Sequence, residues 1–279
     1  MGRMAGKVAF ITGAARGQGR SHALRLAEEG ADIIGIDGCR EIPGTDYPMA
    51  TLAELAETAK EVEARGRRAF FAAADVRDAT ALDTALAEGV DQLGPLDAVV
   101  ANAGIAHLCR DGTLGIEPGI WQTVLDINLT GVWQTCRAAI RHLGDGGAIV
   151  LISSAAGLKG YANIGHYVAA KHGVTGLMRT LAVELAPHRI RSNSVHPGLI
   201  NTDMVHNQAF YAFAGAPGAS RAEADVAFKS MNALPISQLE PVDVSNVVLW
   251  LASDETRYLT GTTQIIDAGA IAPFKIPHA

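Results

Sequence analysis

Two residues four positions apart, Tyr167 and Lys171, are the first pair in this sequence whose types and spacing could do chemistry. On a helix, this spacing places both side chains on one face. The ammonium group would stabilise a tyrosinate and lower the tyrosine pKa from about 10, so the phenol could act as general base toward an alcohol. Ser154, 13 residues before Tyr167, could hydrogen-bond the oxygen of the same substrate. Such a pair alone is near chance level and is usually a solvated helix face, so the interpretation depends on the motifs around it.

A glycine-rich stretch, TGAARGQG at residues 12–19, lies between an apolar strand-like segment and a helix-like one. In that context glycines allow a tight turn and close backbone approach to a pyrophosphate at the helix N-terminus. A plain tight turn is the alternative, and the strand–turn–helix context argues against it. The residues of this turn that we expect to contact a dinucleotide are Gly13, Arg16, Gly17, Gln18 and Gly19.

An acidic residue, Asp37, ends the second predicted strand, 18 residues after Gly19. A carboxylate there can accept hydrogen bonds from both hydroxyls of the adenosine ribose and would repel a 2′-phosphate. The sequence therefore favours NAD over NADP, although Arg16 and Arg40 lie close enough in sequence to supply a compensating cation. A surface acid at a strand end is the alternative interpretation of Asp37.

Polar residues also follow the third and fourth predicted strands, as Asp75-Val76 and Asn102-Ala103-Gly104. Ligands of open α/β sheets bind at these carboxyl ends. Asp75 could accept a hydrogen bond from the adenine amino group. Asn102 could bind backbone and hold the strand ends together, so its role is structural as much as cofactor-binding.

Strand-like and helix-like segments alternate along the whole chain, which predicts a doubly wound α/β fold with a parallel sheet covered on both faces. We predict strands at residues 7–12, 32–36, 69–74, 97–101, 148–152, 190–195 and 263–267. We predict helices at residues 18–29, 51–65, 78–93, 118–143, 166–186 and 243–252. No linker or repeat divides the chain, so residues 1–279 are interpreted as one domain.

Two stretches, 38–50 and 204–233, do not fit this alternation. The first follows Asp37 and would lie near the cofactor. The second is rich in alanine and glycine, carries several aromatic residues, and could be a mobile lid over an apolar substrate, since long irregular segments in compact domains are often functional. An ordinary loop insertion is the alternative. The aromatic residues are Phe210, Tyr211 and Phe213.

Composition excludes several other classes of protein. The 279 residues are 48% apolar and carry a formal net charge of −6, with no long basic run, so a nucleic-acid partner is not expected. Three widely spaced cysteines without a CxxC pair exclude a disulfide framework and fit a cytoplasmic location. No apolar run approaches the roughly 18–20 residues of a membrane span. His107, Cys109 and His196 have no metal-ligand spacing, so no metal is expected.

Taken together, the motifs make the sequence resemble the short-chain dehydrogenase/reductase family. The matching segments are TGAARGQG at 12–19, DV at 75–76, NAG at 102–104, INLTG at 127–131, ISSAAG at 152–157, YVAAK at 167–171, HPG at 196–198 and TGTTQIIDAG at 260–269. The resemblance implies a mostly parallel seven-stranded Rossmann sheet and hydride transfer between a nicotinamide cofactor and an alcohol or ketone.

The same resemblance assigns roles to individual residues. It implies a catalytic tetrad of Asn128, Ser154, Tyr167 and Lys171. In this family pattern Tyr167 is the base in oxidation and the acid in reduction, and Lys171 also bonds the nicotinamide ribose. Asn128 would hold a water that links Lys171 to solvent. Three residues after the sixth predicted strand would lie near the nicotinamide, namely Pro197, Ile200 and Thr202.

A narrower likeness is to the carveol-dehydrogenase-like, mycofactocin-associated actinobacterial subfamily. Gln18 stands where most of the family has an aliphatic residue, and the insertion 38–50, with Cys39, follows Asp37. The resemblance implies that this insertion covers NAD, which stays bound and is reoxidised by an external redox carrier. It also implies a homotetramer formed through helices 118–143 and 166–186 and the last strand. The segment 270–279 has no counterpart in these motifs.

We therefore expect an NAD-dependent dehydrogenase of a small hydrophobic, carveol-like secondary alcohol or ketone. One alternative is a 3-oxoacyl-(acyl-carrier-protein) reductase, which would prefer NADPH and a basic docking patch; Asp37 and the acidic net charge argue against it. Another is a catalytically silent redox-sensing protein on the same fold, against which the intact Ser154, Tyr167 and Lys171 argue. His166 is expected to be structural or to line the pocket.

Overall fold

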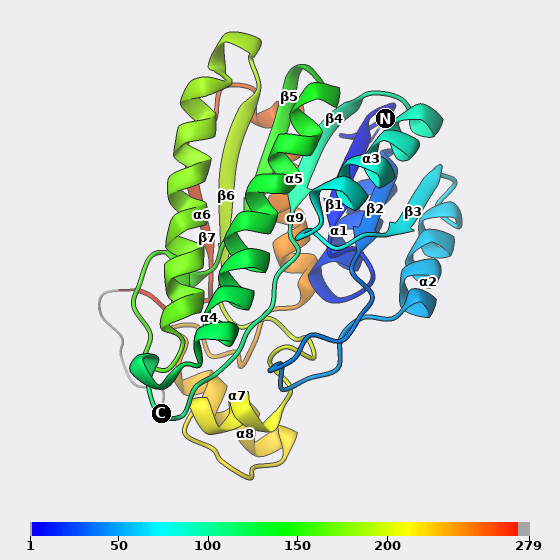
Figure 1. The fold of residues 1–279 in the computed structure, drawn as a ribbon. Coiled ribbons are helices and arrows are strands. Elements are labelled where there is room, and N and C mark those ends of the chain that lie inside the picture. The colour runs from blue at the N-terminus through cyan, green and yellow to red at the C-terminus, as the bar shows by residue number, and fades with distance from the viewer. Residues whose placement is uncertain (1, 273–279) are drawn as a thin grey trace.

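The protein is built around one parallel sheet (Figure 1). The computed structural model describes residues 2–272, so residues 273–279 of the segment 270–279 lie outside the described part. The strands occur in the order β3-β2-β1-β4-β5-β6-β7, and every neighbouring pair is parallel. Their bounds are β1 Val8–Thr12, β2 Asp32–Asp37, β3 Ala69–Ala73, β4 Leu96–Ala101, β5 Leu143–Ile152, β6 Arg191–Pro197 and β7 Thr263–Ile266. The predicted seven-stranded Rossmann sheet is confirmed.

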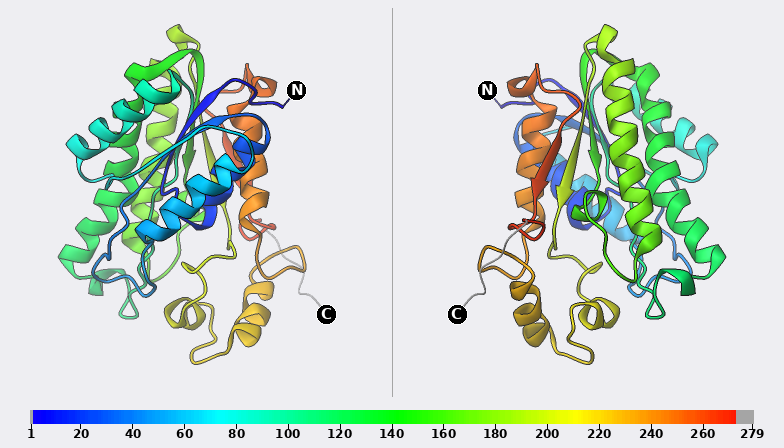
Figure 2. Two further views of the ribbon diagram at one scale, coloured as in Figure 1. Left: turned by 90° about the vertical axis from the view of Figure 1, so that its right-hand side faces the viewer. Right: turned by 90° about the vertical axis from the view of Figure 1, so that its left-hand side faces the viewer.

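Helices cover both faces of this sheet (Figure 2). Helices α1 and α9 pack together on one face, and α3, α5 and α6 cover the other. The helix bounds are α1 Gly17–Glu28, α2 Leu52–Glu63, α3 Ala79–Leu93, α4 Pro118–Leu125, α5 Gly131–Ala139, α6 Gly165–Glu184, α7 Gln208–Phe213, α8 Arg221–Ser230 and α9 Pro241–Ala252. Within the described residues, none of the helices has the length and apolar character needed to cross a membrane.

The strand β1 shows how the sequence builds two cores from one sheet. Successive strand residues point to opposite faces. Accordingly, Val8 and Phe10 belong to the cluster beneath α3, α5 and α6, while Ala9 and Ile11 belong to the cluster beneath α1 and α9. A fully apolar strand is what a sheet buried on both sides requires.

Local capping signals account for where two of the helices begin. The Thr51 hydroxyl accepts from the Glu54 amide, and the Glu54 carboxylate accepts from the Thr51 amide, so the two residues form a capping box at the start of α2. The Asp78 carboxylate accepts from two amides at the start of α3.

The helix predicted over residues 118–143 is present from Pro118 to His142, but it is not regular. The structure divides it into α4, a π-helical turn at Asp126–Thr130, α5 and a 3₁₀ turn at Ile140–His142. The π turn faces inward, where the Asn128 amide donates to the Ile105 carbonyl at 2.7 Å and its oxygen accepts from the Ile105 amide at 2.8 Å. One extra residue in a helical turn is a common way to bring a side chain to a functional site.

The two stretches outside the alternation both lie at the carboxyl edge of the sheet. Residues 38–50 follow β2 without helix or strand, and their buried Tyr47 accepts a hydrogen bond from the Ala106 amide at 3.0 Å. Residues 204–233 contain α7 and α8, which project beyond the strand ends (Figure 1). These two helices have an apolar cluster of their own, made of Val205, Tyr211, Ala224 and Phe228.

Because this cluster is separate from the two main cores, its loss should loosen the 204–233 segment alone. We expect Phe228→Ala to destabilise the segment locally by about 3–5 kcal/mol and to speed proteolytic cleavage within it, while global unfolding changes little. Val226→Ala, on the exposed side of α8, is the matched control. Equal cleavage rates in the two variants, measured by limited proteolysis with mass spectrometry, would contradict this.

Candidate active site

Two adjoining cavities lie at the carboxyl edge of the sheet. The larger, of about 390 Å³, is a groove between the glycine-rich turn, the 38–50 stretch and the ends of β3 and β4. The smaller, of about 120 Å³, lies between β5, α6 and the 204–233 segment. Gln18, Thr202 and Met204 line both, so the two cavities meet at these residues.

The groove collects nearly all of the residues predicted to hold the dinucleotide. Those that line it are Gly13, Arg16, Gly17, Gln18, Gly19, Asp37, Cys39, Asp75, Val76, Asn102, Ala103, Gly104 and Thr202. The structure places Pro197 and Ile200 in the smaller cavity instead, beside Tyr167. Lys171 lies beneath the cavity floor, with its side chain buried.

Close backbone contacts explain why the turn needs glycine. A Cβ on Gly13 would lie 2.9 Å from the Ala103 Cα, at a backbone φ of +70°, and a Cβ on Gly19 would lie 1.8 Å from the Gly13 carbonyl oxygen. The Asn102 amide donates to the Thr12 carbonyl at 2.9 Å and the Gly13 carbonyl at 3.3 Å. Asn102 therefore ties the turn to the end of β4.

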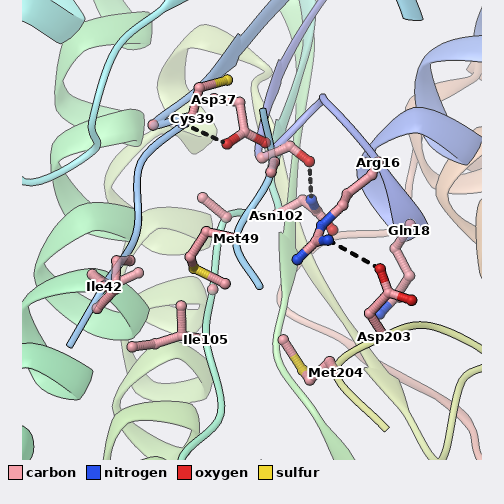
Figure 3. Close-up of a pocket in the computed structure, with 18 of the residues that line it drawn as sticks. Arg16, Gln18, Asp37, Cys39, Ile42, Met49, Asn102, Ile105, Asp203 and Met204 are labelled. Atoms are coloured by element: carbon pink, nitrogen blue, oxygen red, sulfur yellow. Dashed lines mark hydrogen bonds and ion pairs between the residues drawn. The ribbon is translucent and has the colours of Figure 1, made fainter. Parts of the chain in front are cut away.

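Asp37 is fixed at one end of the groove by backbone amides. Its carboxylate accepts from the Ala15 amide at 3.1 Å and from the Cys39 amide at 3.2 Å. Burial raises the pKa of Asp37, and the backbone hydrogen bonds act in the opposite direction. The carboxylate is thus oriented before any ribose hydroxyl binds, and Figure 3 shows it next to Cys39 with this hydrogen bond drawn.

Asp75 has more partners than the sequence indicated. Arg77 binds its carboxylate from the backbone amide and the guanidinium, and Arg40 reaches the same carboxylate at 2.6 Å. Burial by itself raises the pKa of Asp75, but the Arg77 hydrogen bonds and the two positive charges outweigh it and bring the pKa to about 2. Arg40, considered above as a cation for a 2′-phosphate, is instead paired with Asp75.

The four predicted catalytic residues lie together around the end of β5. A hydrogen bond with Ser154 lowers the pKa of Tyr167, but burial raises it by more. The Lys171 ammonium lies 5.6 Å from the centre of the Tyr167 ring and donates to the Ile152 carbonyl at 2.9 Å. Burial lowers the pKa of Lys171 to about 8. The phenol and the ammonium therefore share one water-poor environment that disfavours the charged form of each.

Asn128 reaches this group from the π turn between α4 and α5. Besides its two hydrogen bonds with Ile105, its oxygen would lie 3.1 Å from a Cβ on Gly104, which would also lie 3.6 Å from the Lys171 nitrogen. A Cβ at position 104 would therefore press on the asparagine oxygen while making only ordinary van der Waals contact with the ammonium.

Two buried side chains, one that holds Ser154 and one that contacts the Lys171 backbone, were not predicted by the sequence analysis. His196 on β6 bonds the Ser154 carbonyl through Nδ1 at 2.8 Å and the Ser194 hydroxyl through Nε2 at 2.8 Å. Burial lowers the pKa of His196 to about 4, so the ring is neutral and Nδ1 carries the proton that the carbonyl accepts. Ser153 donates to the Lys171 carbonyl at 3.0 Å. For His196, the available signal was a polar residue inside a fully buried strand.

The smaller cavity is lined by polar and apolar residues, with the predicted catalytic side chains Ser154 and Tyr167 among the polar ones. The apolar lining residues are Leu108, Ile164, Leu199, Met204, Val205, Phe210, Phe213 and Met231. Of the three aromatic residues expected to face a substrate, Tyr211 turns away and packs against Phe228.

His166 lies next to Tyr167 in sequence but belongs to a different contact group. It is fully buried, its Nε2 lies 3.2 Å from the His107 Nδ1, and its ring stacks on Trp121. Among the residues that the structure describes, no group of three or more His, Cys, Asp or Glu side chains could hold a metal ion.

Comparison with known proteins agrees with this geometry. Residues 7–210 match the family described as short chain dehydrogenase. The chain therefore belongs to the short-chain dehydrogenase family and is an oxidoreductase. It is 52% identical over 277 residues to a (−)-trans-carveol dehydrogenase of Rhodococcus erythropolis, covering 96% of this chain and 99% of that one.

Solved structures show the same likeness. A carveol dehydrogenase from Mycobacterium avium in complex with NAD superposes with a TM-score of 0.95 at 50% identity, covering 97% of this chain and 99% of that one. A short chain dehydrogenase from Mycobacterium paratuberculosis bound to NAD gives a TM-score of 0.88 at 44% identity, covering 96% and 99%.

Because His196 holds the Ser154 backbone, its loss should damage turnover more than binding. We expect His196→Ala to lower kcat about tenfold, since a buried carbonyl loses its partner and Ser154 loses its orientation, with a much smaller change in KM for the cofactor. His196→Gln, which retains a donor, should recover part of the rate. Steady-state kinetics would contradict the positioning role if kcat were unchanged or if Gln and Ala behaved alike.

Proposed function

We propose that the protein is an NAD-dependent dehydrogenase that interconverts a secondary alcohol and its ketone. One observation carries this proposal: the half-buried Tyr167, with its hydroxyl bonded to Ser154 and its ring beside Lys171, lines a largely apolar cavity that adjoins a dinucleotide-sized groove. A bound nicotinamide would supply the hydride acceptor or donor.

The groove fits such a cofactor on its own chemistry. The Gln18 side-chain oxygen is buried and has no hydrogen-bond partner among the described residues, and it lies where the two cavities meet. A carboxamide would satisfy it. The glycine-rich turn with Arg16 suits a pyrophosphate, and the oriented Asp37 carboxylate suits ribose hydroxyls.

The protein's part in the chemistry is to hold and move one proton. In alcohol oxidation the Tyr167 oxygen would take the proton of the substrate hydroxyl, and in ketone reduction it would return one. Ser154 would orient the substrate oxygen. The ammonium of Lys171 offsets the effect of burial by favouring the phenolate, and Asn128 would hold a water that passes the proton from Lys171 toward solvent.

The cavity favours a small hydrophobic substrate with a single reacting oxygen. Ser154 and Tyr167 are the proposed catalytic side chains in the cavity lining, and Phe210, Phe213 and Met231 bring the 204–233 segment over its apolar part. We therefore assign this segment as a substrate lid. A carveol-like terpenoid alcohol agrees in chemistry with the names of the relatives.

The two alternatives are not favoured. A 3-oxoacyl reductase would need room and charge for a 2′-phosphate, whereas Asp37 occupies that place and Arg40 is paired with Asp75. A silent redox sensor would not need the Ser154, Tyr167 and Lys171 arrangement that is preserved here.

We further propose that residues 38–50 form a cover over the cofactor, so that NAD is retained between turnovers and reoxidised by an external redox carrier. Support comes from the buried Tyr47, which anchors this stretch on the Ala106 amide, and from Cys39 in the groove wall. The whole chain, 1–279, would then be one catalytic domain with these two additions.

A cytoplasmic homotetramer is the assembly that we propose. Its interfaces would use α4, α5, α6 and β7. Each of the last three carries an exposed apolar side chain that a partner subunit could bury, and these are Trp133, Val183 and Ile265.

Replacing the proposed proton donor tests the mechanism directly. Tyr167→Phe keeps the ring but removes the hydroxyl, so we expect kcat to fall by about 10²–10⁴-fold while NAD binding, measured by protein fluorescence, changes little. Tyr161→Phe, which alters another tyrosine of the same cavity, is the matched control. Near-wild-type turnover of Tyr167→Phe would contradict the proposed role of Tyr167 in proton transfer.

Retention of the cofactor is tested on the protein as purified. We expect denaturation to release close to one NAD(H) per chain, and turnover with added NAD to be poor unless an artificial electron acceptor is present. Empty protein that cycles freely with added NAD would refute retention without touching the assignment as a dehydrogenase.

A further inference from the structure

Arg16 joins three segments that lie far apart in the sequence. It stands in the glycine-rich turn immediately before α1. One guanidinium nitrogen lies 3.0 Å from the Asp203 carboxylate, and the other donates to the Pro48 carbonyl. Pro48 belongs to the cover 38–50, and Asp203 immediately precedes the lid 204–233. Figure 3 shows the Arg16–Asp203 pair at the wall of the groove.

The neighbours of these two partners show what the guanidinium holds in place. Met49 follows Pro48 and lines the groove, while Met204 follows Asp203 and lines both cavities. Separating the cover from the lid at this point therefore requires Arg16 to release one or both of its partners. The other fixed point of the cover is at Tyr47, on the Ala106 amide.

An arginine suits this position for physical reasons. Its planar guanidinium carries five donors and stays charged at any working pH, so it can bond two segments and still direct donors elsewhere. The Arg16 side chain is only 20% exposed, whereas Asp203 is 62% exposed. The arginine is thus held in the groove wall, and the aspartate is the partner free to move away into solvent.

We propose that Arg16 is a cofactor-retaining clamp: by binding the Pro48 carbonyl and the Asp203 carboxylate together, it links the cover to the lid across the groove and slows the departure of the bound dinucleotide. On this proposal Asp203, which immediately precedes the lid, influences the rate of cofactor release through its contact with Arg16. The inference rests on the proposed binding of NAD in this groove and goes beyond it by naming the residues that close it.

The test compares variants by their rate of cofactor exchange. Holoenzyme is mixed with excess isotopically labelled NAD, and uptake of label is followed by rapid gel filtration or rapid quench. Asp203→Asn keeps the side-chain shape but removes the charge. Since partly exposed ion pairs are weak, we expect label uptake about two- to fivefold faster than in the wild type.

The chain offers a closely matched control for this variant. The Lys7–Asp254 pair is also exposed on its acidic side, with Lys7 21% and Asp254 79% exposed, but both residues lie outside the groove lining. We expect Asp254→Asn to exchange NAD at the wild-type rate. Equal rates for Asp203→Asn and the wild type would overturn the clamp.

A double variant shows whether Asp203 acts through Arg16. Arg16→Gln should exchange faster than Asp203→Asn because it loses both partners and also its own proposed contact with the pyrophosphate. If Asp203 acts through Arg16, Arg16→Gln with Asp203→Asn should be no faster than Arg16→Gln alone. A further two- to fivefold acceleration in the double variant would overturn the clamp. The absolute wild-type rate tests retention, whereas the ratios between variants test the clamp, so the two proposals fail separately; a wild type that binds no NAD contradicts both.

Discussion

Burial of a phenol beside an ammonium group, Tyr167 and Lys171 on the first turns of α6, is the constraint around which the site is built. Burial raises the pKa of the first and lowers that of the second to about 8. Burial thus disfavours the charged form of each group. Two surrounding contacts stabilise the pair: Ser154 bonds the phenol, and the Ile152 carbonyl accepts a hydrogen bond from the ammonium.

The parallel sheet brings the catalytic residues, the cover and the lid together at one edge. Because every strand runs in the same direction, the segments that leave β1, β2, β4, β5 and β6 emerge side by side. The cover 38–50 leaves β2, and the lid 204–233 follows β6, so both additions reach the same place. Arg16, which leaves β1, contacts both of them. Specialisation of the site therefore needs no second domain.

Sequence periodicity located most of the framework, including the helix over 118–143, but did not predict the π turn inside it. Nothing within that stretch breaks a helix, since no proline or glycine pair interrupts its apolar spacing. The π turn exists because Asn128 bonds both backbone groups of Ile105, a residue that only the folded chain brings near. The start of β5 at Leu143, five residues before the predicted strand, is likewise decided by pairing with Leu96 on β4.

The sequence by itself determined what depends on neighbours along the chain: the strand–turn–helix with its glycines, the Tyr167–Lys171 spacing on one helix face, and Asp37 at the end of a strand. Tertiary structure alone decided that Arg40 pairs with Asp75, that His196 orients Ser154, and that Arg16 contacts Asp203, 187 positions away. The physical reason is the distance along the chain over which each kind of interaction acts. Backbone periodicity is set by local geometry, whereas a long side chain selects its partner from whatever the packing of the whole sheet places within reach.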